Sequence, residues 1–110
     1  MSKIDELVEK YAKDVEEVGE KLDKTLLRAV AKGCGPSLYK KDTSLVAASD
    51  KKEVERVKQN FCIKKLGIKD TPKLDEGIAE VLKSYKKRQK QRAVVYYLLV
   101  KRFKKGSVYK

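Results

Sequence analysis

The sequence predicts an all-α protein, a compact single domain over residues 1–110 in which short loops join about five helices. Apolar residues recur every three or four positions in five segments, the spacing that gives a helix one apolar face. Residues that start or stop helices separate these segments. A chain of 110 residues also buries enough surface to fold without disulfides or metal.

The first predicted helix begins at a capping box of Ser2 and Asp5 and is followed directly by a second. The apolar stripe of the first consists of Ile4, Leu7, Val8, Tyr11, Val15, Val18 and Leu22. Gly19 weakens this helix by about 1 kcal/mol relative to alanine if the helix continues through it. The second helix begins at Asp23 or Lys24 and ends at Gly33, which suits a left-handed C-cap.

The middle of the chain combines an ambiguous stretch with two clear helices. In residues 37–49 we expect one or two short helical turns and no strand. The side chains expected to pack inward there are Leu38, Tyr39, Leu45 and Val46. A capping box of Asp50 and Glu53 begins the next helix, which ends at Gly67. Thr71 and Pro72 begin the fourth, because proline suits the first helical position.

The last predicted helix spans residues 86–105 and places the apolar run "AVVYYLLV" between two clusters of cations. A strand is the rival interpretation, but the sequence offers no convincing partner strand. At about 100° per residue, one face of this helix is predicted to be core. That face consists of Ala93, Tyr96, Leu99, Val100 and Phe103, and the opposite face of Lys86, Lys90, Val94, Tyr97, Lys101 and Lys104.

This opposite face is the candidate binding site, a surface for an anionic partner. Its predicted members are Lys86, Lys90, Tyr97, Lys101 and Lys104. The tyrosine ring would stack on a base or rest against a partner while the lysines meet negative charges. In the alternative interpretation, Val94 and Tyr97 contact other helices, and the lysines keep only their charged ends in water.

The charge of the chain is strongly asymmetric. The net charge is +12, with −4 in residues 1–23 and +16 in residues 24–110. Such an excess attracts polyanions without specifying which. Lysines outnumber arginines by 23 to 5, whereas arginine is the better bidentate ligand for phosphates and bases. Any nucleic-acid binding is therefore expected to be weak, salt-sensitive and sequence-tolerant.

Catalytic motifs are missing from the sequence. Without histidine, the chain has no Ser-His-Asp triad, Cys-His dyad or HExxH site, and it has no GxxxxGK[ST] loop. Cys34 beside Lys32 is the one candidate for a reactive thiol, although a packed or simply exposed cysteine is the plainer interpretation. We therefore predict a protein that is not an enzyme and has no cofactor, metal or small-molecule ligand.

The predicted location is the cytoplasm. Charged residues occupy the start of the chain, where a signal peptide would be apolar. The longest apolar run is too short to span a membrane. Cys34 and Cys62 lie far apart in the sequence and are expected to be reduced.

The stretch "LLRAVAKGCGPSLYKKDTSLVAASDKKEVERVKQNFCIKKLG", with "RAVVYYLLVKRF" and a terminal "SVY" after it, resembles a known family. This is a family of small bacterial helical proteins catalogued as a domain of unknown function (DUF2853). The resemblance covers nearly the whole chain and implies a compact helical fold. It implies no activity, cofactor or site residue.

Two functions fit these observations. The first is a small non-enzymatic protein that acts through contacts with a protein partner or with its own copies. The acidic first helix and the basic last helix would allow docking within one chain or between chains. The second is weak nucleic-acid binding by the basic carboxyl-terminal helix.

Overall fold

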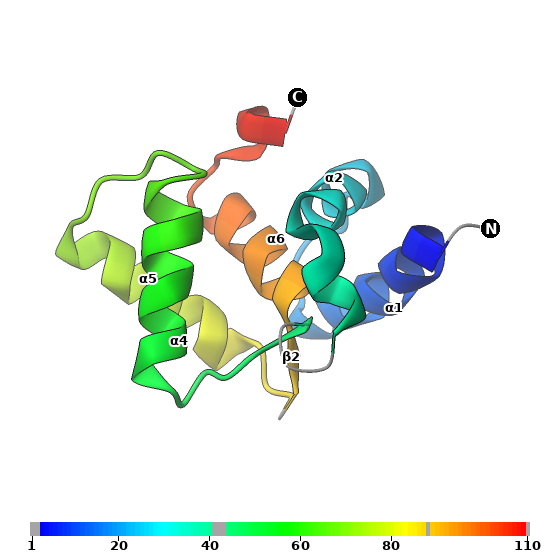
Figure 1. Ribbon diagram of the computed structural model, residues 1–110, viewed down its shortest axis with the longest axis horizontal. Helices are drawn as coiled ribbons and strands as arrows, with labels where there is room; N and C mark the ends of the chain where they lie inside the picture. Colours follow the sequence, from blue (N-terminus) through cyan, green and yellow to red (C-terminus); the bar gives the residue numbers. More distant parts are fainter. Residues whose placement is uncertain (1–2, 41–43, 88, 110) are drawn as a thin grey trace.

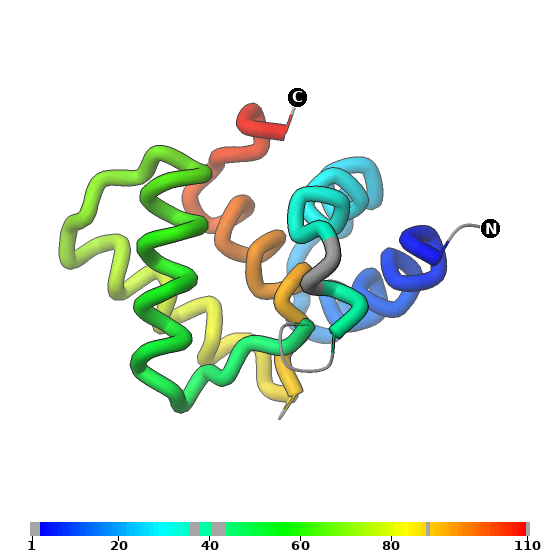
Figure 2. Tube along the Cα trace, viewed as in Figure 1, coloured from blue at the N-terminus to red at the C-terminus, as the bar shows by residue number. Residues whose placement is uncertain are grey.

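Helix α6 (Arg92–Arg102) lies at the centre of the protein, with the other helices around it (Figure 1). The computed structural model describes residues 3–40, 44–87 and 89–109. In these residues the α-helices before α6 are α1 (Lys3–Val18), α2 (Lys24–Cys34), α4 (Lys51–Arg56) and α5 (Pro72–Ser84). Helices α1 and α2 pack on one side of α6 and α5 on the other, as the chain trace shows (Figure 2). The all-α prediction is confirmed.

Helix α6 is buried on nearly every side, so the core face is confirmed at Ala93, Leu99 and Val100. The burial of Val94 and Tyr97 confirms the alternative interpretation for these two residues and contradicts an outer binding face. Val94 and Tyr97, placed on the outer face, are 0% exposed. Tyr96 and Phe103, placed in the core, are only partly buried. The reason is that neighbours flank α6 on both sides, and a helix that is apolar all round is typical of a buried position.

Helix α6 is also shorter than predicted, because the segment before it is extended. Lys90–Gln91 forms strand β2, which pairs antiparallel with β1 (Leu45–Val46). Leu45 lies opposite Gln91, and Val46 lies opposite Lys90. The expectation of no strand in residues 37–49 was therefore wrong. This pairing gives two short extended segments hydrogen-bonding partners that neither could find within itself.

The other expectation for residues 37–49 is confirmed in part. The helical turn exists as the 3₁₀ helix η1 (Gly35–Tyr39), where Leu38 is buried. Val46 is also buried, and Leu45 is partly buried. Tyr39, which was expected to pack inward, is instead 49% exposed.

Most predicted helix ends are confirmed to within a turn, whereas the predicted cap of the first helix, Ser2, lies outside the described residues. Helix α1 ends just before Gly19, whose φ of +91° stops it before Leu22. Asp23 caps α2, since its Oδ1 accepts a hydrogen bond from the Leu26 N–H at 3.1 Å. Gly35, not Gly33, takes the positive φ after α2.

The later helix ends follow the predicted signals. Helix α4 continues as the π-helical segment η2 (Val57–Ile63), and Gly67 follows it with a φ of +71°. Helix α5 begins at Pro72, as predicted. After α6 the described chain ends in the 3₁₀ helix η3 (Gly106–Tyr109). No helix in the described ranges has the length and apolar character needed to cross a bilayer.

Candidate functional site

The predicted anionic-partner surface does not exist as one surface. Lys86 and Lys90 precede α6, whereas Lys101 and Lys104 lie at its opposite end. Nine residues of α6 before Lys101 separate the two groups, a rise of about 14 Å. Tyr97 lies between them but inside the protein, so it offers no ring to a base or a partner.

Tyr97 instead joins the α1–α2 connection to the central helix. Its hydroxyl donates to the Lys21 carbonyl oxygen at 2.6 Å and accepts from the Asp23 N–H at 2.9 Å. Both backbone groups belong to the turn between α1 and α2. The Tyr97 hydroxyl therefore provides hydrogen-bond partners for two backbone groups that lie outside the helices.

We expect Tyr97→Phe to lower the free energy of unfolding by about 1–3 kcal/mol, because it removes the only hydroxyl that bridges these two backbone groups within the described residues. Urea unfolding followed by circular dichroism measures the change. Tyr39→Phe is the matched control, since it removes a hydroxyl from a half-exposed ring and should change stability by less than about 0.5 kcal/mol. Equal stabilities of the two variants would contradict the bridging role.

At the start of α6, the basic segment docks onto acidic α1. Lys87, which was not among the predicted residues, lies 2.6 Å from Asp14 Oδ1 and 3.3 Å from Glu17 Oε2. Asp14 is buried and also accepts a hydrogen bond from the Tyr85 hydroxyl. Lys90 donates to the Lys87 carbonyl oxygen at 2.6 Å. The docking within one chain that the charge layout allowed therefore occurs through Lys87.

At the other end of α6, Lys101 and Lys104 line a pocket of about 390 Å³ between α2 and the carboxyl-terminal segment. Its apolar lining residues are Leu26, Ala29 and Val100. Within the described part of the chain, no carboxylate oxygen lies within 4.0 Å of either ammonium group. The pocket, which we call the lysine pocket, thus presents two ammonium groups that form no ion pair with a described carboxylate, beside an apolar surface.

A second pocket of about 350 Å³ adjoins the first at Tyr109, which lines both. We call it the tyrosine pocket. Residues far apart in the sequence meet in it, namely Cys34, Phe61, Lys65, Arg92, Tyr96 and Tyr109. Sequence analysis predicted none of these as a pocket residue except for the possible reactivity of Cys34.

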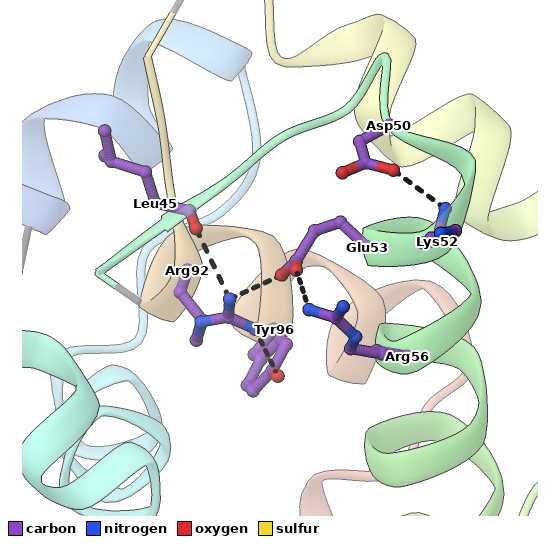
Figure 3. Close-up of polar contacts among 7 residues, drawn as sticks. All are labelled: Leu45, Asp50, Lys52, Glu53, Arg56, Arg92 and Tyr96. Atoms are coloured by element: carbon purple, nitrogen blue, oxygen red, sulfur yellow. Dashed lines mark hydrogen bonds and ion pairs between the residues drawn. The ribbon is translucent and has the colours of Figure 1, made fainter. Parts of the chain in front are cut away.

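Arg92, which lines the tyrosine pocket, forms polar contacts with residues from β1, α4 and α6 (Figure 3). Its Nη2 lies 2.5 Å from Glu53 Oε1 and donates to the Leu45 carbonyl oxygen at 3.3 Å. Its Nη1 donates to the Tyr96 hydroxyl at 2.9 Å. Glu53 also accepts from Arg56 at 3.3 Å.

The predicted capping box at the start of α4 is confirmed for Asp50 and wrong for Glu53. Asp50 caps α4, because its side chain accepts a hydrogen bond from the Lys52 N–H at 2.9 Å. The Glu53 carboxylate pairs with two arginines instead.

The composition held one signal for this cluster. Only five of the 28 cations are arginines, and arginine is the residue preferred for buried ion pairs. Arg92 follows a lysine-rich stretch and precedes the apolar run, a position where a partly buried cation is expected. Its carboxylate partner, 39 residues earlier, could not be identified from spacing.

The thiol of Cys34 is not activated. Burial raises its pKa to about 11, although the nearby Arg92 acts in the opposite direction. Burial also raises the pKa of Cys62, to about 12. Since the thiolate is the nucleophile, both cysteines are protonated and weakly reactive near neutral pH.

We expect iodoacetamide to alkylate Cys34 roughly a hundredfold more slowly than free cysteine at about pH 8, with a rate that rises until the pH reaches about 11. Mass spectrometry of the modified peptide measures the rate. In guanidinium chloride, Cys34 and Cys62 should react at the ordinary rate. A rate that levels off below about pH 9 in the folded protein would contradict the raised pKa.

Most of the chain matches the sequence model of one protein family. The sequence model of the family described as Protein of unknown function (DUF2853) matches residues 10–107. The chain belongs to this family. No curated protein sequence matches this DUF2853 chain. The family description attaches no activity, so the function of this DUF2853 member has to be argued from its own surfaces.

Proposed function

We propose that this DUF2853 protein is a non-enzymatic, cytoplasmic protein that binds an acidic protein partner through the lysine pocket. The observation that carries the proposal is the pair of ammonium groups of Lys101 and Lys104, which form no ion pair with a described carboxylate and lie beside the apolar residues Leu26, Ala29 and Val100. A peptide with carboxylates around an apolar side chain complements both features. The one acid in the described lining, Asp23, is engaged in capping α2.

The acidic partner is expected to be a different protein and not a second copy of this chain. Four of the six carboxylates of α1 are already used within the chain. They pair with Lys24, Arg28 and Lys87, and they belong to Asp5, Glu9, Asp14 and Glu17. Without breaking these pairs, a second copy could offer the lysine pocket only Glu6 and Glu16 from α1, which form no ion pair among the described residues.

A non-enzymatic role agrees with the state of the cysteines. The raised pKa of Cys34 removes the one nucleophile that the sequence suggested. The groups that cluster around it are phenols and cations, which suit binding better than proton abstraction near neutral pH.

The binding test uses a fluorescent peptide of glutamate and leucine and measures anisotropy against the full chain. The doubly substituted variant Lys101→Glu/Lys104→Glu should weaken binding by at least about tenfold, because it reverses both charges of the pocket. The matched control, Lys86→Glu/Lys90→Glu, makes the same change in net charge at the opposite end of α6 and should stay within about twofold.

A peptide of glutamate and serine separates the contribution of charge to binding from that of apolar contact. It should bind more weakly than the leucine peptide, because serine leaves the apolar part of the lysine pocket unfilled. Equal losses in the two double variants would show nonspecific charge attraction and overturn the proposal. Absence of binding to the leucine peptide at low salt would overturn it as well.

Weak, sequence-tolerant nucleic-acid binding is the second candidate. The +16 charge of residues 24–110 favours it, whereas the burial of Tyr97 removes the expected stacking ring. In a salt titration with mixed-sequence DNA, this candidate requires a log–log slope of about −0.9 for each phosphate contact. Tighter binding to DNA than to the leucine peptide at the same salt concentration would favour it over the first proposal.

A further inference from the structure

We propose that the tyrosine pocket binds a small monocarboxylate with a flat apolar body, such as an aromatic acid. The pocket has a volume of about 350 Å³, near the small end of the range for ligand sites. Neither Lys101 nor Lys104 lines it, so this inference does not depend on the proposed function. The charge, the hydrogen-bond donors and the shape of the pocket all favour such a ligand.

The charge around the tyrosine pocket favours a monoanion. Its described lining includes Lys65 and Arg92 but no carboxylate. Glu53 pairs with both Arg92 and Arg56, so these three side chains carry a net charge of +1. The ammonium of Lys65 lies 5.3 Å from the centre of the Tyr109 ring, with no described carboxylate within 4.0 Å. Lys65 is therefore the cation that an incoming carboxylate would meet.

The neutral groups of the pocket can donate to that carboxylate. The Tyr96 hydroxyl accepts from Arg92 Nη1, and no described residue accepts its own hydrogen. The Tyr109 hydroxyl likewise has no acceptor among the described residues. Burial raises the pKa of both phenols and of Cys34, so none of them brings a competing negative charge near neutral pH. Hydrogen bonds to a carboxylate are stronger than those between neutral groups.

The walls of the pocket are flat and aromatic. The rings of Phe61 and Tyr96 stack with their centres 3.9 Å apart and an angle of 11° between their planes. The Tyr109 ring forms another wall and packs close to Gly33, where a Cβ would lie 3.4 Å from Tyr109 Cε1. Aromatic walls favour a flat apolar ligand, because rings pack well in offset-stacked and edge-to-face contacts.

Isothermal titration calorimetry of the full chain with benzoate tests the inference, with benzamide as the neutral probe of the same shape. Benzoate should bind saturably, and benzamide at least about tenfold more weakly, because it cannot pair with Lys65. Lys65→Met should weaken benzoate by about tenfold, and Tyr109→Phe by about threefold. Lys83→Met, an exposed lysine on α5 that does not line the pocket, should change benzoate affinity by less than about twofold.

A second measurement locates the bound probe. Saturating benzoate should slow the alkylation of Cys34 in the folded chain, because this thiol lines the pocket, and should leave the alkylation of Cys62 unchanged. Absence of saturable benzoate binding would overturn the inference. Equal affinities for benzoate and benzamide would overturn it too, as would equal losses in Lys65→Met and Lys83→Met.

Discussion

Replacing Val94 with lysine should unfold the protein. Val94 is 0% exposed on the central helix, so the new ammonium would be buried without a partner. Burying an unpaired charge costs several kcal/mol, a large part of the roughly 5–15 kcal/mol by which a domain is stable. The expected result is a loss of the helical circular dichroism signal and of the cooperative thermal transition.

Val108→Lys is the matched control for this prediction. Val108 is 37% exposed in η3, so its lysine can keep its charge in water. The control should retain a transition within a few degrees of the original protein. A Val94→Lys variant with an equally cooperative transition would show that this side of α6 faces solvent, as the interpretation of an outer binding face requires.

Glu53→Ala should lower the free energy of unfolding by about 3 kcal/mol, because it removes a carboxylate that pairs with the largely buried guanidinium of Arg92. The side chains of Glu53 and Arg92 are each only 13% exposed, so water cannot replace the lost partner fully. Adding Arg92→Met to Glu53→Ala should recover part of the loss, because the largely buried guanidinium is then removed together with its carboxylate partner. Urea unfolding measures both variants.

The exposed pair of Glu80 and Arg102 provides the comparison. These side chains are 62% and 47% exposed, and Glu80→Ala should cost less than about 1 kcal/mol. If Glu53→Ala and Glu80→Ala lose similar stability, the Arg92 cluster is no more important than a surface ion pair. If the added Arg92→Met lowers the stability further, the stability lost in Glu53→Ala did not come from the buried guanidinium of Arg92.

Local signals in the sequence predicted the helix ends well. Asp23 begins α2 and Pro72 begins α5, because capping and proline geometry depend on a few neighbouring residues. The surroundings of α6 could not be predicted in the same way. Periodicity identifies one apolar face, but the burial of Val94 and Tyr97 depends on how many helices pack around that segment.

The sites depend even more on long-range contacts. The β1–β2 pairing joins Leu45 to Gln91, and two-residue strands leave almost no pattern in a sequence. The tyrosine pocket needs Cys34, Phe61 and Tyr109 to meet around Arg92. The lysine-rich pattern did indicate Lys101 and Lys104, which line the lysine pocket. It placed Lys86 and Lys90 on the same surface because the prediction was one continuous helix over residues 86–105.

The central position of α6 determines when this protein can fold during synthesis. Helices α1, α2 and α5 leave the ribosome before the helix against which all three pack. Until α6 follows them, their apolar faces have only water, one another or a chaperone to contact. The domain therefore cannot be completed helix by helix, and its native core forms only once translation has passed α6.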